Sequence, residues 1–234
     1  MSARPFEAVI FDCDGVLVDS EILGLDASAD YLRRHGFSWT REDLVRLFTG
    51  FRDDVFAAKL TEAYRALHGK TPAPDFFEGL VETRRARRHL LKPVPDAETA
   101  LKALQEGERP FAVASSSRTE YLTGKMQRVG LYDLAAPHVY SADLVAHGKP
   151  APDIFLYAAD RLNVEPEACL VIEDSANGVR AGLAAGMTVW GFLGGGHVFA
   201  GHGERLLEAG AHDLVEDFKA FLSRLDGASP DPQR

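Results

Sequence analysis

Apolar residues along the chain follow two different spacings. From Ile22 to about Leu91 they recur every three or four residues, which is the spacing of one helix face, and Gly36, Gly50 and Gly69 interrupt the pattern. This region predicts about four helices, in the segments SEILGLDASADYLRRHGF, REDLVRLF, DDVFAAKLTEAYRALHG and PDFFEGLVETRRARRHLL.

Short apolar runs replace this spacing in the rest of the chain. They are AVIF at 8–11, FAVAS at 111–115, HVYS at 138–141, CLVIED at 169–174 and TVWGFL at 188–193. The segments that predict helices are 97–105, 120–129, 151–163 and 177–186, followed by a helix, strand and helix in 205–225. Apolar strands that alternate with helices are typical of a parallel sheet with helices on both faces.

The order of these elements predicts an α/β fold with an inserted helical-bundle domain. The opening strand belongs to the sheet, so the helical region interrupts the sheet domain after its first strand. We expect residues 1–18 and 93–226 to form the sheet domain, residues 19–92 the inserted domain, and residues 227–234 a disordered tail. Both linkers join one edge of the sheet, which allows the insertion to act as a lid.

Composition and charge narrow the functional classes. The 234 residues carry 26 basic and 35 acidic side chains, and a net charge of −9 argues against nucleic acid or an anionic membrane as partner. No apolar run approaches the roughly 18 residues of a membrane span, and the start MSARPFEAV has no signal-peptide core. Two cysteines without zinc-site spacing fit a reduced compartment. We expect a cytoplasmic protein that is a monomer or a weak homo-oligomer.

Chemically reactive side chains stand where the predicted strands end. They are Asp12 and Asp14 after AVIF, Ser115 to Ser117 after FAVA, and Glu173 and Asp174 after CLVI. Lys149 precedes the helix that leads into CLVIED. Ligands of open parallel sheets bind outside the carboxyl ends of the strands, so these segments are expected to converge on one site.

Each of these residues also has a simpler explanation when it is taken alone. Residues i and i+2 of a strand face the same side, so the like charges of Asp12 and Asp14 would lie close together. A divalent metal, a shared proton or both would offset them, whereas the simpler explanation is a solvated turn. Ser115 fits a turn or a helix cap, and Lys149 fits a solvated charge. Their joint occurrence favours a functional site.

Four sequence motifs resemble those of the haloacid-dehalogenase-like hydrolases. In chain order they are DCDGVLVDS, VASSS, GKPAPDIF and VIEDSANGV. The resemblance extends from about Phe6 to Val215 and is closest to the branch with a helical cap after the first strand, which includes β-phosphoglucomutase-like phosphatases. It implies a Rossmann-like parallel sheet and a cap that closes over its carboxyl edge.

The resemblance also implies a Mg²⁺-dependent phosphatase that acts on a small phosphorylated metabolite, a sugar or sugar-acid phosphate. Asp12 would be the nucleophile that becomes an aspartyl phosphate, and Asp14 would be the general acid and base. The groups that hold the phosphoryl oxygens would be Ser115, Lys149 and the backbone N–H groups of Cys13 and Ser116. The metal ligands would be Asp12, the backbone carbonyl of Asp14 and Asp174, with Glu173 as a ligand or as an acceptor beside the ligands.

Other functions on this scaffold stay open. The sugar phosphomutases of the family carry a histidine about ten residues beyond the acid/base aspartate, where this chain has Gly24, and this difference favours a phosphatase. Phosphonate hydrolysis would use a cap lysine, for which Lys59 and Lys70 lack a recognisable motif. A non-enzymatic sensor of phosphorylated metabolites would not need Asp12 and Asp14.

Three further features allow two interpretations each. Gly50 and Arg52 lie in a loop that either contacts the substrate or makes a plain turn. A basic run forms either a solvated helix face or a clamp for a second anionic group; its members are Arg84, Arg85, Arg87 and Arg88. The segment GGGH at 194–197 does not fit a nucleotide-binding fingerprint, and a mobile loop is the interpretation that we adopt.

Overall fold

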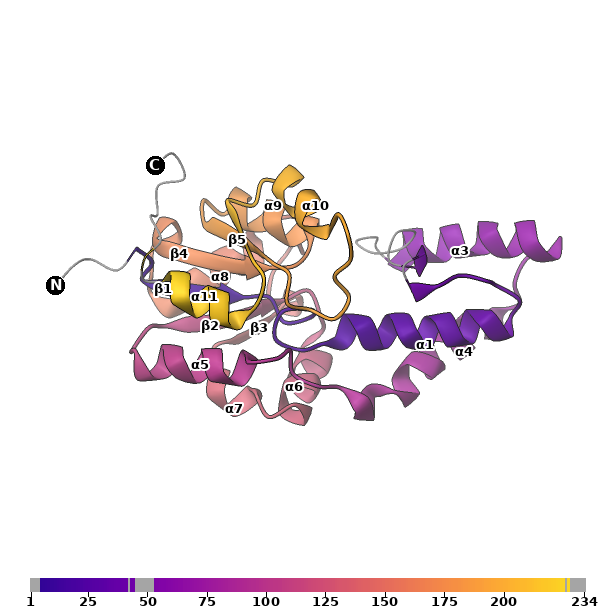
Figure 1. Ribbon diagram of the computed structural model, residues 1–234, viewed down its shortest axis with the longest axis horizontal. Coiled ribbons are helices and arrows are strands. Elements are labelled where there is room, and N and C mark those ends of the chain that lie inside the picture. Colours follow the sequence, from indigo (N-terminus) through magenta and orange to yellow (C-terminus); the bar gives the residue numbers. More distant parts are fainter. Residues whose placement is uncertain (1–4, 42, 45–52, 226, 228–234) are drawn as a thin grey trace. The chain divides into compact units, whose positions relative to one another are not determined.

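The computed structural model describes residues 5–41, 43–44, 53–225 and 227 (Figure 1). The chain divides into two compact units. Residues 1–19 and 92–234 form the first, called the sheet unit, and residues 20–91 form the second, called the helical unit. Among the described residues, no helix is both long and apolar enough to cross a membrane.

Six parallel strands form the centre of the sheet unit. They are β1 (Ala8–Phe11), β2 (Phe111–Ser115), β3 (Val139–Ser141), β4 (Cys169–Glu173), β5 (Thr188–Phe192) and β6 (Asp213–Val215). Their order in the sheet is β3-β2-β1-β4-β5-β6, and each neighbouring pair is parallel. This order confirms the predicted Rossmann-like fold. The strand order reverses between β1 and β4, and ligands of such sheets bind at that point.

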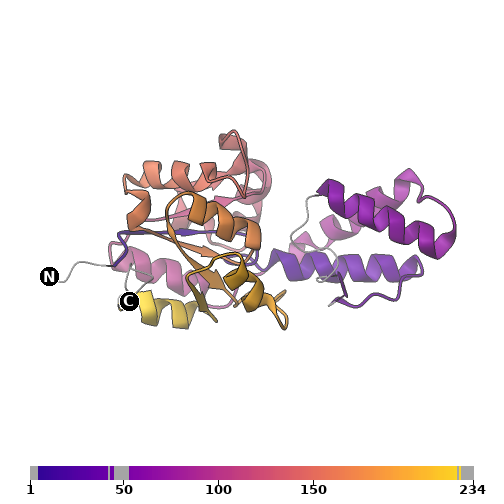
Figure 2. The same cartoon turned by 90° about the horizontal axis from the view of Figure 1, so that it is seen from above.

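Helices cover both faces of the sheet, as the alternation of elements predicted. Figure 2 shows α8 (Asp153–Leu162) and α9 (Ala176–Ala184) on one face, and α5 (Ala97–Glu106) and α11 (Phe218–Leu225) on the other. The remaining helices of this unit are α6 (Thr119–Arg128), the short α7 (Tyr132–Ala135) and α10 (His202–Glu208). Short 3₁₀ turns at Ala142–Leu144 and Pro166–Ala168 were not predicted.

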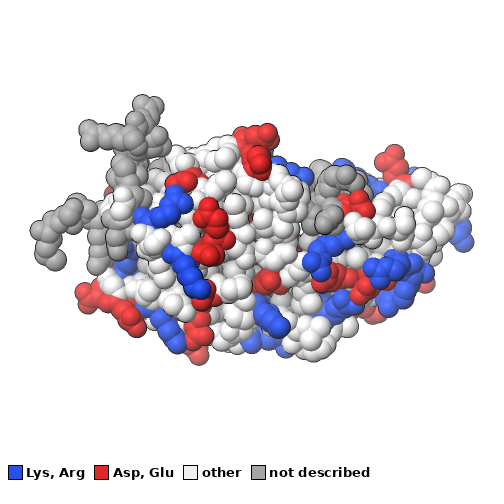
Figure 3. Space-filling model, viewed as in Figure 1, with Lys and Arg blue, Asp and Glu red and all other residues white. Residues whose placement is uncertain are grey.

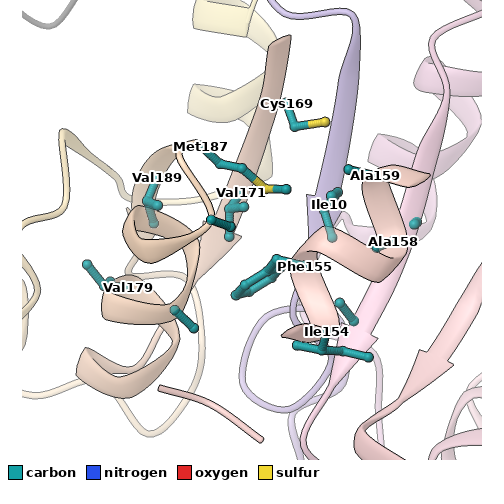
Figure 4. Close-up of a cluster of buried hydrophobic side chains, with 14 of the residues drawn as sticks. Ile10, Ile154, Phe155, Ala158, Ala159, Cys169, Val171, Val179, Met187 and Val189 are labelled. Carbon is teal, nitrogen blue, oxygen red and sulfur yellow. The ribbon is translucent and has the colours of Figure 1, made fainter. Parts of the chain in front are cut away.

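The strands are apolar throughout because both sheet faces are buried. All four residues of β1 are fully buried, and successive side chains point to opposite faces. Ile10 belongs to the cluster that includes Phe155 of α8 (Figure 4), whereas Phe11 packs against Phe218 and Phe221 of α11 at ring-centroid distances of 6.1 and 5.6 Å. Each buried side chain of this size contributes about 1.5–3 kcal/mol, which fixes the position of β1 and of the residues that follow it.

The helical unit has a hydrophobic core of its own. Its helices are α1 (Ser20–Arg34), α3 (Asp53–His68) and α4 (Pro74–Ala86), and a 3₁₀ turn follows at Arg88–Leu90. Leu32, Leu60 and Phe76 are buried between them, and the hydroxyl group of Tyr31 donates to the carbonyl of Phe76 at 2.8 Å. This separate core explains how the insertion folds although none of its described residues belongs to a strand of the sheet.

The two connections to the insertion run beside each other. The amide of Asp19 donates to the carbonyl of Lys92 at 3.0 Å, and the amide of Val94 donates to the carbonyl of Leu17 at 2.9 Å. These bonds join the chain as it leaves β1 to the chain as it returns toward α5. The geometry after β1 is therefore held from both sides of the insertion.

Candidate active site

The carboxyl ends of β1, β2 and β4 bring the predicted residues together. These strands are neighbours, and Phe11 pairs in register with Val113 on one side and Ile172 on the other. The amide of Asp12 donates to the carbonyl of Ile172 at 3.0 Å, so the first residue after β1 is still tied to β4. The position of the Asp12 carboxylate follows directly from the sheet.

Lys149 is buried among these strand ends. Its ammonium group donates to Asp12 Oδ1 at 2.5 Å, to Glu173 Oε1 at 2.7 Å and to the carbonyl of Ala114 at 3.0 Å. The Lys149 side chain is 5% exposed, and its Nζ lies 4.7 Å from the ring centroid of Phe155. The three N–H groups thus contact the ends of three strands, and the solvated-charge interpretation of Lys149 is wrong.

Negative charge outweighs positive charge around Lys149. Burial raises the pKa of Asp12 well above its usual value; Lys149 opposes this shift, while Glu173, Asp174 and Asp14 add to it. Burial likewise raises the pKa of Glu173, again against the effect of Lys149. Burial disfavours a charged lysine, but Asp12 and Glu173 outweigh that effect and raise the pKa of Lys149. Lys149 therefore stays charged. Its single positive charge does not reverse the rise in the pKa values of Asp12 and Glu173.

Asp14 points toward the end of β2. Its Oδ2 accepts a hydrogen bond from Ser117 Oγ at 2.8 Å and an ion-paired hydrogen bond from Lys125 Nζ, and it lies 3.5 Å from Ser115 Oγ. Ser117 Oγ also accepts from Lys125 Nζ at 2.7 Å, and the amide of Ser117 donates to Ser115 Oγ at 3.1 Å. A compact group of two serines and a lysine therefore orients the Asp14 carboxylate.

The sequence prediction missed the part that Lys125 plays here. Burial disfavours its charge, but Asp14 outweighs that effect and raises the pKa of Lys125. Helix α6 carries this lysine, and the amide and hydroxyl groups of Thr119 at its start donate to Asp143 Oδ2 at 2.8 and 3.1 Å. The sequence contains one signal: Lys125 stands three residues after the apolar Leu122, and residues three apart lie on the same face of a helix. In the structure Leu122 is buried, so this face points inward.

Glu173 uses both carboxylate oxygens within the protein. Oε1 accepts from Lys149, and Oε2 accepts from the amide of Ser175 at 2.9 Å and from its hydroxyl group at 3.0 Å. A Cβ at Gly178 of α9 would lie 1.6 Å from Oε1, so only glycine leaves room for this carboxylate. Glu173 links Lys149 to the start of α9.

Asp174 is held by two histidines that the sequence prediction did not assign to the site. Its Oδ2 lies 3.0 Å from His197 Nε2, and its backbone carbonyl oxygen lies 2.8 Å from His202 Nε2. The amide of Gly196 donates to Asp19 Oδ1 at 3.0 Å, and His197 is 3% exposed. The GGGH segment is therefore packed against the site, and close approach explains its glycines better than a mobile loop does.

The remaining predicted substrate-binding residues differ in their burial, and two of them are not described. Cys13 is fully buried, with burial raising the pKa of its thiol well above the usual value, and Ser116 is exposed. Gly50 and Arg52 lie outside the described residues.

The arginine cluster lies at the end of α4 and in the turn that follows it. Arg84 Nε donates to Ser28 Oγ at 2.7 Å, and Arg87, directly after α4, pairs with Asp30, so both of these arginines contact α1. Arg85 and Arg88 are exposed. Figure 3 shows basic side chains interspersed with acidic ones on the visible face, and the contacts of Arg84 and Arg87 favour a structural role for those two residues.

The donor atoms at the strand ends fit a hard divalent cation. The carboxylates of Asp12 and Asp174 and the backbone carbonyl of Asp14 offer oxygen only, which suits Mg²⁺. In the described part of the chain, no three His, Cys, Asp or Glu side chains are grouped as a complete metal site. Burial chiefly raises the pKa values of Asp12 and Glu173, and neighbouring carboxylates add to the shift, which a cation would oppose.

Comparison with known proteins gives the same assignment as the motifs. The family model of the haloacid dehalogenase-like hydrolases matches residues 6–186. The chain is 35% identical over 212 residues to the phosphorylated carbohydrates phosphatase of Thermotoga maritima, covering 90% of this chain and 94% of that protein. It is 28% identical over 193 residues to the 6-phosphogluconate phosphatase of Escherichia coli, covering 82% and 84%.

Solved structures share the whole architecture. A HAD family hydrolase from Deinococcus radiodurans R1, crystallised with bound phosphate and sodium, has a TM-score of 0.85 at 35% identity and covers 95% of this chain and 97% of its own. A Thermotoga maritima protein provisionally described as a beta-phosphoglucomutase has a TM-score of 0.75 at 34% identity, with coverages of 93% and 99%. The chain belongs to the haloacid dehalogenase-like hydrolase family and is an enzyme of the hydrolase class.

Proposed function

We propose that the protein is a Mg²⁺-dependent phosphatase that releases phosphate from a small phosphorylated sugar or sugar acid through an aspartyl-phosphate intermediate. The observation that carries this proposal is the position of Lys149, whose Nζ lies 2.5 Å from Asp12 Oδ1 and 2.7 Å from Glu173 Oε1 at the carboxyl edge of the sheet. A buried ammonium beside a carboxylate nucleophile is suited to receive an anionic phosphoryl group.

Asp12 is the proposed nucleophile. Its oxygen forms a bond to phosphorus while the bond from phosphorus to the ester oxygen breaks, and the departing oxygen takes a proton from Asp14. Water then attacks the aspartyl phosphate and gives its proton to Asp14, which frees Asp12 and inorganic phosphate. Ser117 and Lys125 donate to Asp14 Oδ2, and these contacts would orient the carboxyl group for both proton transfers.

The other strand ends supply the proposed phosphate contacts. Ser115 and Lys149 side chains, with the backbone N–H groups of Cys13 and Ser116, would hold the transferring oxygens. These positions follow β1 and β2 directly, so the donors are preorganised by the sheet.

Asp12, Asp174 and the backbone carbonyl of Asp14 would hold Mg²⁺. A bound Mg²⁺ would offset the charge of the phosphoryl group and keep Asp12 ionised despite the burial that raises its pKa. We propose that Glu173 acts beside this set, because Lys149 and Ser175 already occupy its two oxygens. Its function would be to position Lys149.

The names of relatives support the substrate class. One is a phosphorylated carbohydrates phosphatase and another a 6-phosphogluconate phosphatase. We propose that the helical unit, bounded by residues 19–92 in the sequence prediction, acts as a cap that sets specificity. Gly50 and Arg52, which precede α3 in the chain, would contribute to that role.

Phosphate release from a panel of sugar phosphates, hexitol phosphates and 6-phosphogluconate tests the proposal. Wild type is compared with Asp12→Asn and with Asp160→Asn, an exposed aspartate of α8 that serves as a matched control. We expect release with Mg²⁺ that is lost in EDTA and in Asp12→Asn but kept in Asp160→Asn. Release that persists in Asp12→Asn would contradict the proposal.

A phosphomutase is the second candidate, because one structural neighbour carries that provisional description. Gly24 stands where the mutases of the family have a histidine, and a Cβ at Gly24 would meet nothing within 4 Å. The same assays separate the two activities. Conversion of β-glucose 1-phosphate to glucose 6-phosphate without phosphate release would favour the mutase.

A further inference from the structure

A buried histidine donates to the carboxylate that we assign to the metal. His197 Nε2 lies 3.0 Å from Asp174 Oδ2, and the two side chains are 2% and 7% exposed. In such a pair the imidazole N–H donates and the carboxylate oxygen accepts. This contact reaches from the loop after β5 to the end of β4, the neighbouring strand.

Glycines on both sides make the contact possible. Gly15, in the turn after β1, has a φ of +80°. A Cβ at this position would lie 1.9 Å from Asp174 Oδ2 and 2.7 Å from His197 Cε1. A Cβ at Gly195 would lie 2.5 Å from the carbonyl oxygen of Gly15. The loop after β5 therefore packs tightly on the turn after β1, with the His197 ring between them.

A second histidine fixes the main chain of the same aspartate. His202, the first residue of α10, is 4% exposed, and its Nε2 donates to the backbone carbonyl oxygen of Asp174 at 2.8 Å. The His197 and His202 rings contact each other edge-on at 5.3 Å. Asp174 is thus held at both its side chain and its backbone.

We propose that His197 and His202 are positioning residues that orient Asp174 for metal binding and so set the affinity of the site for Mg²⁺. This inference rests on the proposed function. Hydrogen bonds to metal-ligating groups orient them, and losing such a bond typically costs about 10–100-fold in metal affinity or activity. Neither histidine is among the residues proposed to hold the phosphoryl group. Their substitution is therefore expected to change the affinity for Mg²⁺ and not the binding of phosphate.

Two amide substitutions of His197, to Gln and to Asn, test the contact because they differ in the position of the side-chain nitrogen. The side-chain nitrogen of Gln can take the place of Nε2, whereas that of Asn corresponds to Nδ1 and is too short to reach Asp174. We expect His197→Asn to raise the Kd for Mg²⁺ about 10–100-fold and His197→Gln to raise it less than about threefold. The exposed His212 provides the control, because its Nδ1 accepts from the amide of Val189 at 3.0 Å and the side-chain oxygen of His212→Asn can accept the same hydrogen bond.

Metal binding is measured by calorimetry with Mg²⁺ on the full chain without substrate, and kcat and KM are measured separately over a range of Mg²⁺ concentrations. We expect His197→Asn to recover most of kcat at saturating Mg²⁺ with KM unchanged. An unchanged Kd in folded His197→Asn, or equal Kd values in the Asn and Gln variants, would overturn the inference. If His197→Asn does not fold, His202→Asn with the same readouts replaces it. A wild type that releases phosphate but binds no Mg²⁺ would overturn the metal assignment and this inference with it, while leaving the phosphatase itself standing.

Discussion

Removing the ammonium of Lys149 tests how the site balances its charge. In Lys149→Met, Asp12 and Glu173 lose the buried cation that lies 2.5 and 2.7 Å from their oxygens. Breaking a buried ion pair from one side costs about 3–5 kcal/mol, which at an m-value of about 2–3 kcal/mol/M shifts the urea midpoint by about 1–2.5 M. The matched control is Lys102→Met, which breaks an exposed pair with Glu98 and is expected to cost less than about 1 kcal/mol.

The loss of stability in Lys149→Met should depend on pH. Burial raises the pKa values of Asp12 and Glu173 in the folded state, and without Lys149 both values rise further. The folded protein then binds more protons than the unfolded chain above the unfolded pKa values, so stability increases as the pH falls. The destabilisation is expected to be smaller at pH 5 than at pH 8.

Urea unfolding in EDTA, followed by tryptophan fluorescence, to which Trp190 buried in β5 contributes, measures this effect. EDTA removes any cation that would replace the lysine. Equal midpoints for Lys149→Met and Lys102→Met at pH 8 would refute the electrostatic reasoning. A loss of the same size at both pH values would also refute it, because packing alone would then explain the change.

Two further predictions concern Asp14 and Glu173. Lys125→Met removes the cation that orients Asp14, so we expect kcat to fall about 10–100-fold with little change in KM. Lys125→Arg is expected to keep most of the activity. A change confined to KM would contradict this role of Lys125. Gly178→Ala places a Cβ 1.6 Å from Glu173 Oε1 and is expected to cost about 1–3 kcal/mol in urea unfolding. Gly124→Ala, whose Cβ would meet nothing within 4 Å in α6, should be neutral or stabilising by up to about 1 kcal/mol, and equal midpoints for the two alanine variants would count against the close contact at Glu173.

The parts of the site that follow strand ends were predictable from the sequence. Asp12, Ser115 and Glu173 lie at or next to the last residue of β1, β2 and β4, and the parallel sheet brings those ends together whatever the loops do. The apolar strands were equally legible because both faces of the sheet are buried. Local pattern was sufficient wherever the sheet alone decides the position.

Lys125 and His197 could not be placed in the same way. Leu122 indicates the inner face of α6, but the start of the helix is also bound by Asp143 from a different segment, and the contact of Lys125 with Asp14 joins residues 111 positions apart. His197 reaches Asp174 because Gly15 has no side chain, a requirement that lies 182 positions away in the chain. Such positions depend on contacts between distant segments, which hydrophobic spacing does not reveal.

The fate of a labelled phosphoryl group tests the central claim most directly. A single turnover of a ³²P-labelled sugar phosphate identified by the panel is quenched in acid at successive times, and the label is located in substrate, protein and inorganic phosphate. The account predicts that the label appears transiently on the peptide containing Asp12 and then in inorganic phosphate at a rate consistent with kcat. Label that enters inorganic phosphate without passing through Asp12, or that moves from the protein to a second sugar hydroxyl, would contradict it.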